Sequence, residues 1–363
     1  MTADQLGLPE RMGGSGPLVS VIVPTYRDSD YLPDALKSIG AQSFRNIEVI
    51  LVDASDVEWV EQLADERNWI QYVRQHQSGV STARNDGLTA ASGKYAAFLD
   101  ADDYWHPQKL TRQVAALEDG AAASYTGQYF FNFWGGEDPR LKVYDHLPRS
   151  AETAHVDLLR GHVTAHTSTL MFQLSAVPSR PFNESLQHFE DVVFAVELFK
   201  AHPPRHIAEP LAVRRLRRGS LSDRTDEHEK YEERMAAYEY LAEEYPDLKS
   251  VIDRARTREA AGRGWTYFQD DQGAIARDHF LESLRYEPAN YTSITLYALT
   301  FLPVDGATVS KLLKSMRDTF SRAAGVTGTR SENNERALRL APSEHSDYRP
   351  SRGIRSQASE GRH

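Results

Sequence analysis

The first hundred residues alternate between short apolar runs and segments whose apolar residues recur at helical spacing. The runs predict buried strands, at residues 18–24, 47–53, 70–73 and 94–99. The segments between them predict amphipathic helices, at residues 31–41, 57–66 and 80–91. This order is typical of a right-handed, mainly parallel sheet covered by helices, so the pattern predicts an α/β fold.

The pattern is less regular after residue 104 and becomes helical after residue 226. Between these positions it predicts a helix, three strands and a second helix, at residues 109–117, 122–134, 141–144, 167–172 and 189–199. The first two of these strands flank a Gly135-Gly136 turn and are expected to pair antiparallel. The last part predicts long amphipathic helices, at residues 228–245, 248–268, 273–286, 290–302 and 308–322.

These patterns divide the chain into four parts. We expect a flexible N-terminus at 1–17, an α/β domain at 18–225, a helical C-terminal domain at 226–324 and a disordered tail at 325–363. The helical domain is expected to pack on the α/β domain. The alternative is that it docks on a membrane or a partner protein, through residues 296–302 and the cationic, amphipathic segment 309–322.

Composition excludes several classes of protein. The chain of 363 residues contains no cysteine, which excludes disulfides, thiolate catalysis and cysteine-based zinc sites. Its net charge of −10 argues against general nucleic-acid binding, which needs a basic surface. The N-terminus has no secretory signal pattern and no run reaches about 18 apolar residues. We therefore expect a cytoplasmic protein, or one attached peripherally to the cytosolic face of the membrane.

Three acids follow the strand at 94–99 within four positions: Asp100, Asp102 and Asp103. A buried strand that ends in carboxylates is costly unless the acids meet cations or lie in a polar cleft. An Asp-x-Asp pair can hold a hard divalent ion such as Mn²⁺ or Mg²⁺, which completes its coordination with water or substrate phosphates. The ordinary alternative is a solvated acidic turn, and the rest of the chain decides between them.

Polar residues also follow the other predicted strands. Tyr26, Asp53 and Asp100 fall at carboxyl ends of strands, where ligands bind in open α/β sheets. Taken alone, Tyr26, Asp53 and Arg84, which belongs to the predicted helix at 80–91, each have an ordinary explanation: a loop aromatic, a helix N-cap and half of a surface ion pair. Their occurrence as an ordered set favours one binding site.

Four motifs of the sequence resemble those of the family 2 glycosyltransferases of the GT-A fold. They are Val-Ile-Val-Pro-Thr-Tyr at 21–26, the strand ending at Asp53, Gly-Val-Ser-Thr-Ala-Arg-Asn at 79–85 and Leu-Asp-Ala-Asp-Asp at 99–103. The resemblance is strongest over 18–110 and extends more loosely to about residue 223. It implies a Rossmann-like mixed, mainly parallel sheet with flanking helices, to which this chain adds the C-terminal helical extension.

The resemblance also implies an activity. We expect an inverting, metal-dependent, hexosyltransferase-type enzyme that takes sugar from a nucleotide-diphosphate sugar, with a UDP-sugar favoured. Its acceptor would be a glycan, a lipid-linked molecule or a protein, in the synthesis of cell-surface polysaccharide or glycoprotein glycans. The alternative hypothesis is a non-catalytic nucleotide-sugar-binding subunit that docks a glycan-assembly complex.

Matching positions carry the roles that the family implies for the donor. Thr25 and Tyr26 would line the nucleotide base, and Asp53 would accept a hydrogen bond from it. Arg84 would lie near the base and the diphosphate. In the acidic turn, Asp100 would bind the ribose and Asp102 the divalent metal, with Asp103 close by. One departure is Asp-Ala-Ser-Asp at 53–56, where the family more often has two adjacent acids and a glycine.

Two later segments complete the expected site. Glu190 and Asp191 open a helix, where acids complement the helix dipole; the resemblance implies that Asp191 is the general base, with Glu190 as its neighbour. Four arginines lie within residues 214–218 and could form a solvated face. The family places a comparable segment over the donor diphosphate, so Arg217, with Arg218 beside it, is expected to bind it through bidentate hydrogen bonds.

Three further residues are candidates for lining an acceptor cleft. They are Trp134, His162 and His166, which lie in the irregular middle of the chain. Single histidines and tryptophans are more often packing or surface features.

Overall fold

The structure of the protein is a computed structural model. It describes residues 1–13, 19–26, 30–55, 57–75, 77, 79–132, 140–144, 148–216, 220, 225–302, 306 and 308–309. The described chain forms one compact unit from Met1 to Gly306, and a second unit begins at Ala307. The predicted helix at 308–322 and the predicted disordered tail at 325–363 lie almost wholly outside the described residues.

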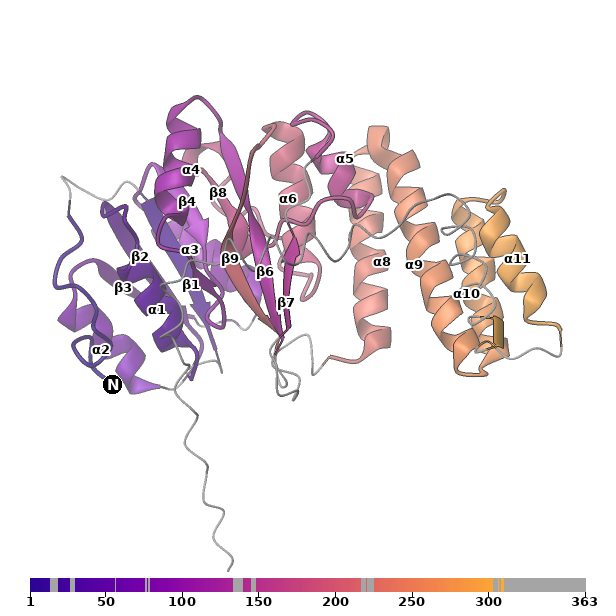
Figure 1. Ribbon diagram of the computed structural model, residues 1–363, viewed down its shortest axis with the longest axis horizontal. Helices are drawn as coiled ribbons and strands as arrows, with labels where there is room; N and C mark the ends of the chain where they lie inside the picture. Colours follow the sequence, from indigo (N-terminus) through magenta and orange to yellow (C-terminus); the bar gives the residue numbers. More distant parts are fainter. Residues whose placement is uncertain are drawn as a thin grey trace, which may run out of the picture. The chain divides into compact units, whose positions relative to one another are not determined.

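Nine strands of the described chain form one mixed sheet (Figure 1). They are β1 (Val19–Thr25), β2 (Ile47–Asp53), β3 (Ile70–Arg74), β4 (Tyr95–Phe98), β5 (Tyr104–Trp105), β6 (Ala123–Asn132), β7 (Arg140–Tyr144), β8 (Leu170–Gln173) and β9 (Arg205–Leu216). The order across the sheet is β3-β2-β1-β4-β8-β6-β9-β5, with β7 paired to β6. The strands β1 to β4 are parallel to one another, which confirms the prediction from the first hundred residues.

The second half of the sheet is mixed. The strand β8 is antiparallel to both β4 and β6, and β9 is parallel to β6. The pair β6–β7 is antiparallel, as predicted, and its turn lies outside the described residues. The sequence pattern missed β5 and β9. It also placed a strand start at residue 167, where the structure has a 3₁₀ turn, η1 (Thr167–Thr169), before β8.

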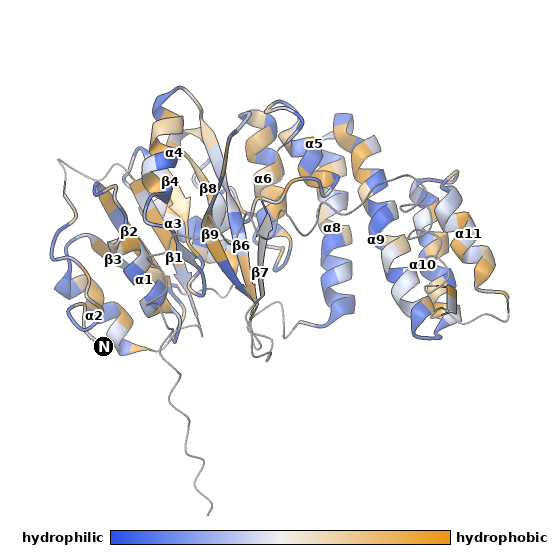
Figure 2. Ribbon diagram, viewed as in Figure 1, coloured by the Kyte–Doolittle hydropathy of each residue, from blue (hydrophilic) through white to orange (hydrophobic). Residues whose placement is uncertain are grey.

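Helices cover both faces of the sheet, whose strands carry hydrophobic residues interrupted by hydrophilic ones (Figure 2). One face carries α1 (Leu32–Gly40), α2 (Glu58–Glu66) and α4 (Lys109–Glu118), which pack on Val21, Val49 and Leu51. The other carries α3 (Val80–Ala90), α5 (Ala154–Leu159) and α6 (Glu190–Ala201), which pack on Ile22, Ile50 and Phe98. Burial on both faces is the reason why β1 and β2 are mostly apolar rather than strictly alternating.

The C-terminal helices begin against this second core. They are α8 (Glu227–Glu244), α9 (Lys249–Gln269), α10 (Gly273–Tyr286) and α11 (Tyr291–Leu299), and each packs on the next (Figure 1). Tyr238 of α8 and Ile252 of α9 belong to the same buried cluster as Phe98 of the sheet. The α/β part and the first two of these helices are therefore joined by one continuous hydrophobic core.

The helix α11 differs from its neighbours in its surface. It carries no charged residue, and its only fully buried side chain is Ser293. Tyr291 is 82% exposed and Phe301, just after the helix, is 62% exposed. None of the described helices combines the length and the apolar character needed to span a bilayer. Docking of this region on a membrane or a partner stays a prediction.

The first residues of the chain pack on α2. Ala3, Leu6 and Leu8 are buried, and Asp4 forms an ion pair with Arg67 at the end of α2. Residues 1–13, which belong to the segment expected to be flexible, are thus in contact with the α/β core.

The close approach of α3 to the sheet depends on Gly87. A Cβ atom there would lie 2.3 Å from Ile22 Cγ2 and 3.2 Å from Val52 Cγ2. We expect Gly87→Ala to lower the free energy of unfolding by about 1–3 kcal/mol, because buried atoms must shift. Gly262→Ala is the matched control in α9, where a Cβ would meet nothing within 4 Å. The control should be stabilising by about 0.5–1 kcal/mol in urea unfolding, and equal changes in both variants would contradict the packing argument.

Candidate functional site

The three acids after β4 form a tight turn at the carboxyl edge of the sheet. The Asp103 N–H donates to the Asp100 carbonyl at 2.9 Å. Ser168 of η1 holds both ends of this turn: its Oγ donates to Asp103 Oδ2 at 2.7 Å and accepts from the Asp100 N–H at 3.2 Å. The acidic turn therefore has a fixed geometry, set by a serine 65 residues away in sequence.

Arg84 of α3 connects this turn to the start of α6. Its guanidinium donates to Asp100 Oδ1 at 3.0 Å and to Glu190 Oε1 at 2.6 Å. Thr167 Oγ1 accepts a third bond from it at 3.2 Å. Arg84 is only 3% exposed, so the structure buries a cation between acids of the two halves of the predicted site.

The charges around Arg84 favour its ionised form. Burial opposes the charge, but Asp100, Glu190 and Asp191 together raise the pKa of Arg84 above its ordinary value. For Glu190, burial raises the pKa and the Arg84 charge opposes it. In the structure the terminal nitrogens of Arg84 bind protein acids, and its expected place near the base and the diphosphate stays a prediction.

The acids Asp102 and Asp103 lie in an electrostatically unfavourable place for carboxylates. Burial raises the pKa of Asp102, and the charges of Asp103 and Asp100 raise it further. Burial and Asp100 likewise raise the pKa of Asp103. Arg214 of β9 opposes both shifts. A divalent cation would relieve the same repulsion, so the donor set suits Mg²⁺ or Mn²⁺.

A metal held here would depend on the substrate for part of its coordination. Among the residues that the structure describes, no group of three or more His, Asp or Glu side chains forms a complete metal cage. Magnesium characteristically binds through one or two carboxylates together with substrate phosphates. Asp102 fits this mode.

The residues predicted to bind the base lie at the ends of β1 and β2. Asp53 is fully buried; its Oδ1 accepts from the Ser55 N–H at 2.8 Å and its Oδ2 from Tyr72 Oη at 3.2 Å. Thr25 is buried as well, and its Oγ1 has no hydrogen-bond partner within the described chain. Tyr26 is 45% exposed at the same edge. An unsatisfied buried hydroxyl beside an exposed ring is consistent with a ligand-binding edge.

Asp191 lies in the first turn of α6. It is half-buried, and its Oδ1 accepts from the Val192 N–H at 2.8 Å. The preceding Glu190 is held by Arg84, which in turn holds Asp100. The structure thus brings Asp191 within one residue of the network around the acidic turn.

The arginine run divides in the structure. The Arg215 side chain turns inward and forms an ion pair with Asp34 at 2.7 Å. The backbone N–H of Arg215 donates to Asp103 Oδ1 at 3.1 Å. Arg214 contributes positive charge to Asp102 and Asp103. Arg217 and Arg218, the residues expected at the diphosphate, lie outside the described residues, so their role stays a prediction.

The three residues predicted to line an acceptor cleft do not lie together in the described structure. His166 adjoins the site: its Nδ1 lies 2.8 Å from Gln128 Nε2, and burial lowers the pKa of its imidazole well below the ordinary value. His162 lies elsewhere, with Nδ1 3.7 Å from Asp157 Oδ1 at the end of α5. Trp134 lies outside the described residues.

Sequence reasoning missed Thr167 and Ser168, and it named Arg214 only as a member of the arginine run. The two hydroxyl residues belong to Thr167-Ser168-Thr169, a polar run that is unusual at the start of a buried strand. Since Ser and Thr side chains readily form hydrogen bonds with nearby groups, this run indicates a turn whose hydroxyl groups bond to neighbouring residues.

Beneath η1 lies a buried lysine. Lys109 is fully buried; its Nζ donates to Gln113 Oε1 at 2.6 Å and lies 4.0 Å from the ring centroid of Trp105. Gln113 Nε2 donates to the Thr169 carbonyl at 3.0 Å, and Trp105 Nε1 to the Ser168 carbonyl at 2.8 Å. These contacts anchor η1 from the interior.

Burial lowers the pKa of Lys109 well below its ordinary value. Between the folded pKa and the unfolded value of about 10.4, the unfolded chain binds one more proton, so stability should rise with pH by up to about 1.4 kcal/mol per unit. Lys109→Met should remove this slope in denaturation measured at several pH values. Lys249→Met, which changes a lysine that is 61% exposed, should keep it. Parallel curves for wild type and Lys109→Met would contradict the prediction.

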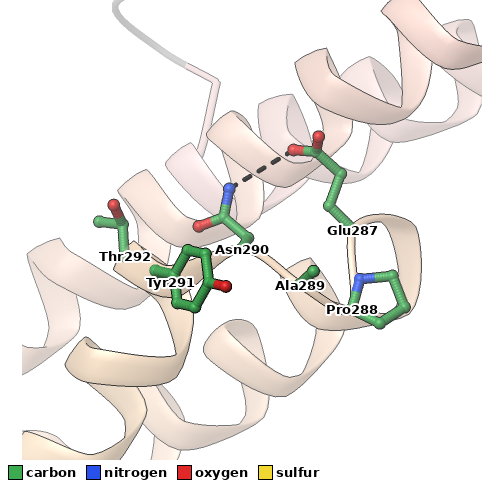
Figure 3. Close-up of a pocket in the computed structure, with 6 residues that line it drawn as sticks. All are labelled: Glu287, Pro288, Ala289, Asn290, Tyr291 and Thr292. Atoms are coloured by element: carbon green, nitrogen blue, oxygen red, sulfur yellow. Dashed lines mark hydrogen bonds between the residues drawn. The ribbon is translucent and has the colours of Figure 1, made fainter.

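One surface pocket of about 500 Å³ lies at the turn between α10 and α11, lined by Glu287, Pro288, Ala289, Asn290, Tyr291 and Thr292 (Figure 3). Its lining comes from six consecutive residues, with Asn290 Nδ2 bonded to Glu287 Oε2 at 3.4 Å. None of the strand-end residues contributes to it.

Comparison with known proteins agrees with this geometry. Residues 20–176 match the family described as glycosyl transferase family 2. TuaG of Bacillus subtilis, named as a teichuronic acid biosynthesis glycosyltransferase, is 36% identical over 141 residues, 37% of this chain and 54% of TuaG. EpsH of the same organism, named as a glycosyltransferase, is 25% identical over 235 residues, 61% of this chain and 67% of EpsH.

The fold has a counterpart among solved structures. The crystal structure of S. aureus TarS 1–349 in complex with UDP-GlcNAc matches with a TM-score of 0.58 and 18% identity, over 78% of this chain and 90% of that one. This likeness concerns the fold alone, and the chain spans about half the length of TuaG. The family match and the relatives thus identify a glycosyl transferase family 2 domain over residues 20–176, and the sheet has the GT-A fold.

Proposed function

We propose that the protein is an inverting glycosyltransferase that moves a sugar from a nucleotide-diphosphate sugar to a glycan or lipid-linked acceptor. The observation that carries this proposal is the double bridge of Arg84. It joins Asp100, at the expected donor edge, to Glu190, the neighbour of the expected base, at 3.0 and 2.6 Å. The carboxylates expected on the donor side and the acceptor side thus lie around one buried guanidinium, which supports the close approach of donor and acceptor that a direct displacement needs.

In this mechanism Asp191 takes the proton of the acceptor hydroxyl. The hydroxyl oxygen attacks the anomeric carbon while the bond from that carbon to the diphosphate oxygen breaks, which inverts the configuration. Asp53 and Tyr26 orient the base, and Asp100 the ribose. Asp102 would hold the divalent ion, which supplies positive charge to the leaving diphosphate. Arg214, with Arg217 and Arg218, adds cationic stabilisation of the same charge.

The relatives support a choice of substrates. TuaG is named for teichuronic acid biosynthesis, and TarS was crystallised with UDP-GlcNAc. We infer a UDP-sugar donor and an acceptor in cell-surface polysaccharide synthesis, with the reaction on the cytosolic side. The glycoprotein alternative has no comparable support among these relatives.

A thermal-shift panel of UDP- and GDP-sugars, with and without Mn²⁺, tests the donor class. Ligand at 100 times its Kd stabilises a protein by about 2.7 kcal/mol, so even a slowly turned-over donor is detected. We expect a UDP-sugar to raise the Tm most, and Mn²⁺ to increase the shift. In Asp102→Asn the contribution of Mn²⁺ should disappear. Equal shifts with and without Mn²⁺ in wild type would remove the metal from the proposal.

The second candidate is a non-catalytic nucleotide-sugar-binding subunit. The observation that favours it is the exposed, uncharged surface of α11, where Tyr291 is 82% exposed. Such a subunit would bind the donor as the enzyme does but would not need Asp191.

A further inference from the structure

The turn before α6 has a backbone conformation that phenylalanine rarely adopts. Phe189 has φ 70°, in the left-handed region where a Cβ atom crowds the backbone. Within the described chain, only Phe189 and Asp271 have such a φ without being glycine. Strained conformations of this kind persist only when the surroundings hold them. This one immediately precedes Glu190 and Asp191.

The helix α8 holds the backbone of this turn. Glu233 Oε2 accepts from the N–H of His188 at 2.6 Å and from the N–H of Gln187 at 3.2 Å. The imidazole Nε2 of His188 lies 2.8 Å from Thr225 Oγ1, just before α8 begins. Two consecutive backbone donors are thus fixed by one carboxylate of a C-terminal helix.

The same helix holds the ring of Phe189. The Tyr238 ring packs edge-on against it, with centroids 5.2 Å apart and planes at 70°. The Arg234 guanidinium lies 5.5 Å from the Phe189 ring centroid, and its NH1 donates to Glu259 of α9 at 2.6 Å. The restraint on Phe189 therefore extends through α8 to α9.

We propose that α8 is a positioning element for the catalytic base. Glu233, Arg234 and Tyr238 hold the left-handed turn at Phe189, and the turn sets the direction in which Asp191 leaves the start of α6. This inference rests on the proposed function, in which Asp191 is the base. The match to the family ends at residue 176, so both the turn and α8 lie beyond it. The C-terminal helical region thereby positions the group that takes the proton.

Variants of Glu233 test the backbone restraint. Glu233→Ala should lower kcat by about 10- to 100-fold, because small displacements of a reacting group are costly. The Kd for UDP in Mg²⁺ buffer should stay at the wild-type value, because Asp53 and Asp100 are untouched. Glu233→Gln retains a carbonyl oxygen for both N–H groups and should keep most of kcat. Glu232→Ala, one residue away and 62% exposed, is the matched control and should keep all of it.

Variants of the strained residue test the conformation. Phe189→Gly removes both the crowded Cβ and the packed ring, which frees the turn, so kcat should fall at least tenfold with an unchanged UDP Kd. Asp271→Gly relieves the same type of strain, at φ 59° after α9, and should leave kcat unchanged. Wild-type kcat in both Glu233→Ala and Phe189→Gly would overturn the proposal, as would a loss of UDP affinity equal to the loss of kcat.

Hydrogen exchange separates this inference from the proposed function. Without any substrate, amides of residues 186–191 should exchange faster in Glu233→Ala than in wild type or Glu232→Ala. Unchanged exchange would overturn the role of α8 even before a donor is identified. A wild-type protein that exchanges as expected but transfers no sugar would overturn only the proposed function.

Discussion

Asp191→Asn is expected to lower kcat by about 10²- to 10⁴-fold, the range that general-base catalysis supplies. The amide keeps the size and the hydrogen bond to the Val192 N–H but cannot accept the acceptor's proton. Donor binding should be nearly unchanged, because in the proposed mechanism Asp191 acts on the acceptor and not on the donor. The measurement is initial-rate sugar transfer together with calorimetric UDP binding.

Glu197→Gln is the matched control, on the same helix, where the carboxylate accepts from Tyr240 Oη at 2.9 Å. It should transfer sugar at the wild-type rate. Full turnover in Asp191→Asn would exclude the residue as base. A wild-type chain that binds UDP but transfers no sugar to any acceptor would favour the binding-subunit hypothesis.

Arg84→Met is expected to lower the free energy of unfolding by about 3 kcal/mol or more and to abolish transfer. Its removal leaves Glu190, with a side chain 9% exposed, without its counter-charge, and uncompensated buried charge carries a penalty of this order. Asp100 is 32% exposed and should contribute less. The measurement is urea unfolding at pH 7, combined with the transfer assay.

Arg180→Met provides the comparison. Arg180 also bridges two acids, Asp86 and Glu184, but its side chain is 44% exposed. Solvent screens such pairs, so the change should stay within about 1 kcal/mol. A similar loss in both variants would mean that burial is not what makes the Arg84 bridge strong.

The first half of the fold could be predicted because its signals are local. The strands β1 to β4 are short apolar runs separated by amphipathic helices, and each element is recognisable without its neighbours. The strand β9 could not be predicted in this way. It carries Glu209, Pro210, Arg214 and Arg215 and becomes a strand through pairing with β6, some 80 residues earlier. The strand β5 has two residues, too few for any periodicity.

The residues of the candidate site show the same contrast between local and long-range signals. Tyr26, Asp53 and the acidic turn were predictable because strand ends of a parallel sheet meet at one edge. The contacts that hold the site in place could not be predicted, since Ser168 bonds to Asp103 across 65 residues and Glu233 bonds to His188 across 45. The left-handed Phe189 had no sequence signal at all, because glycine or asparagine is the residue type that normally marks this conformation.

The hydrophobic core that runs from Phe98 of the sheet to Tyr238 of α8 and Ile252 of α9 has a practical consequence for protein engineering. A chimera joined at residue 226 would cut through this core and leave apolar surface on both halves. Exchanging the helical region between relatives should therefore yield insoluble or inactive hybrids unless the facing residues of α6 are transferred with it. When new specificities are engineered by recombination, the segment exchanged between relatives should therefore run from β1 to α9.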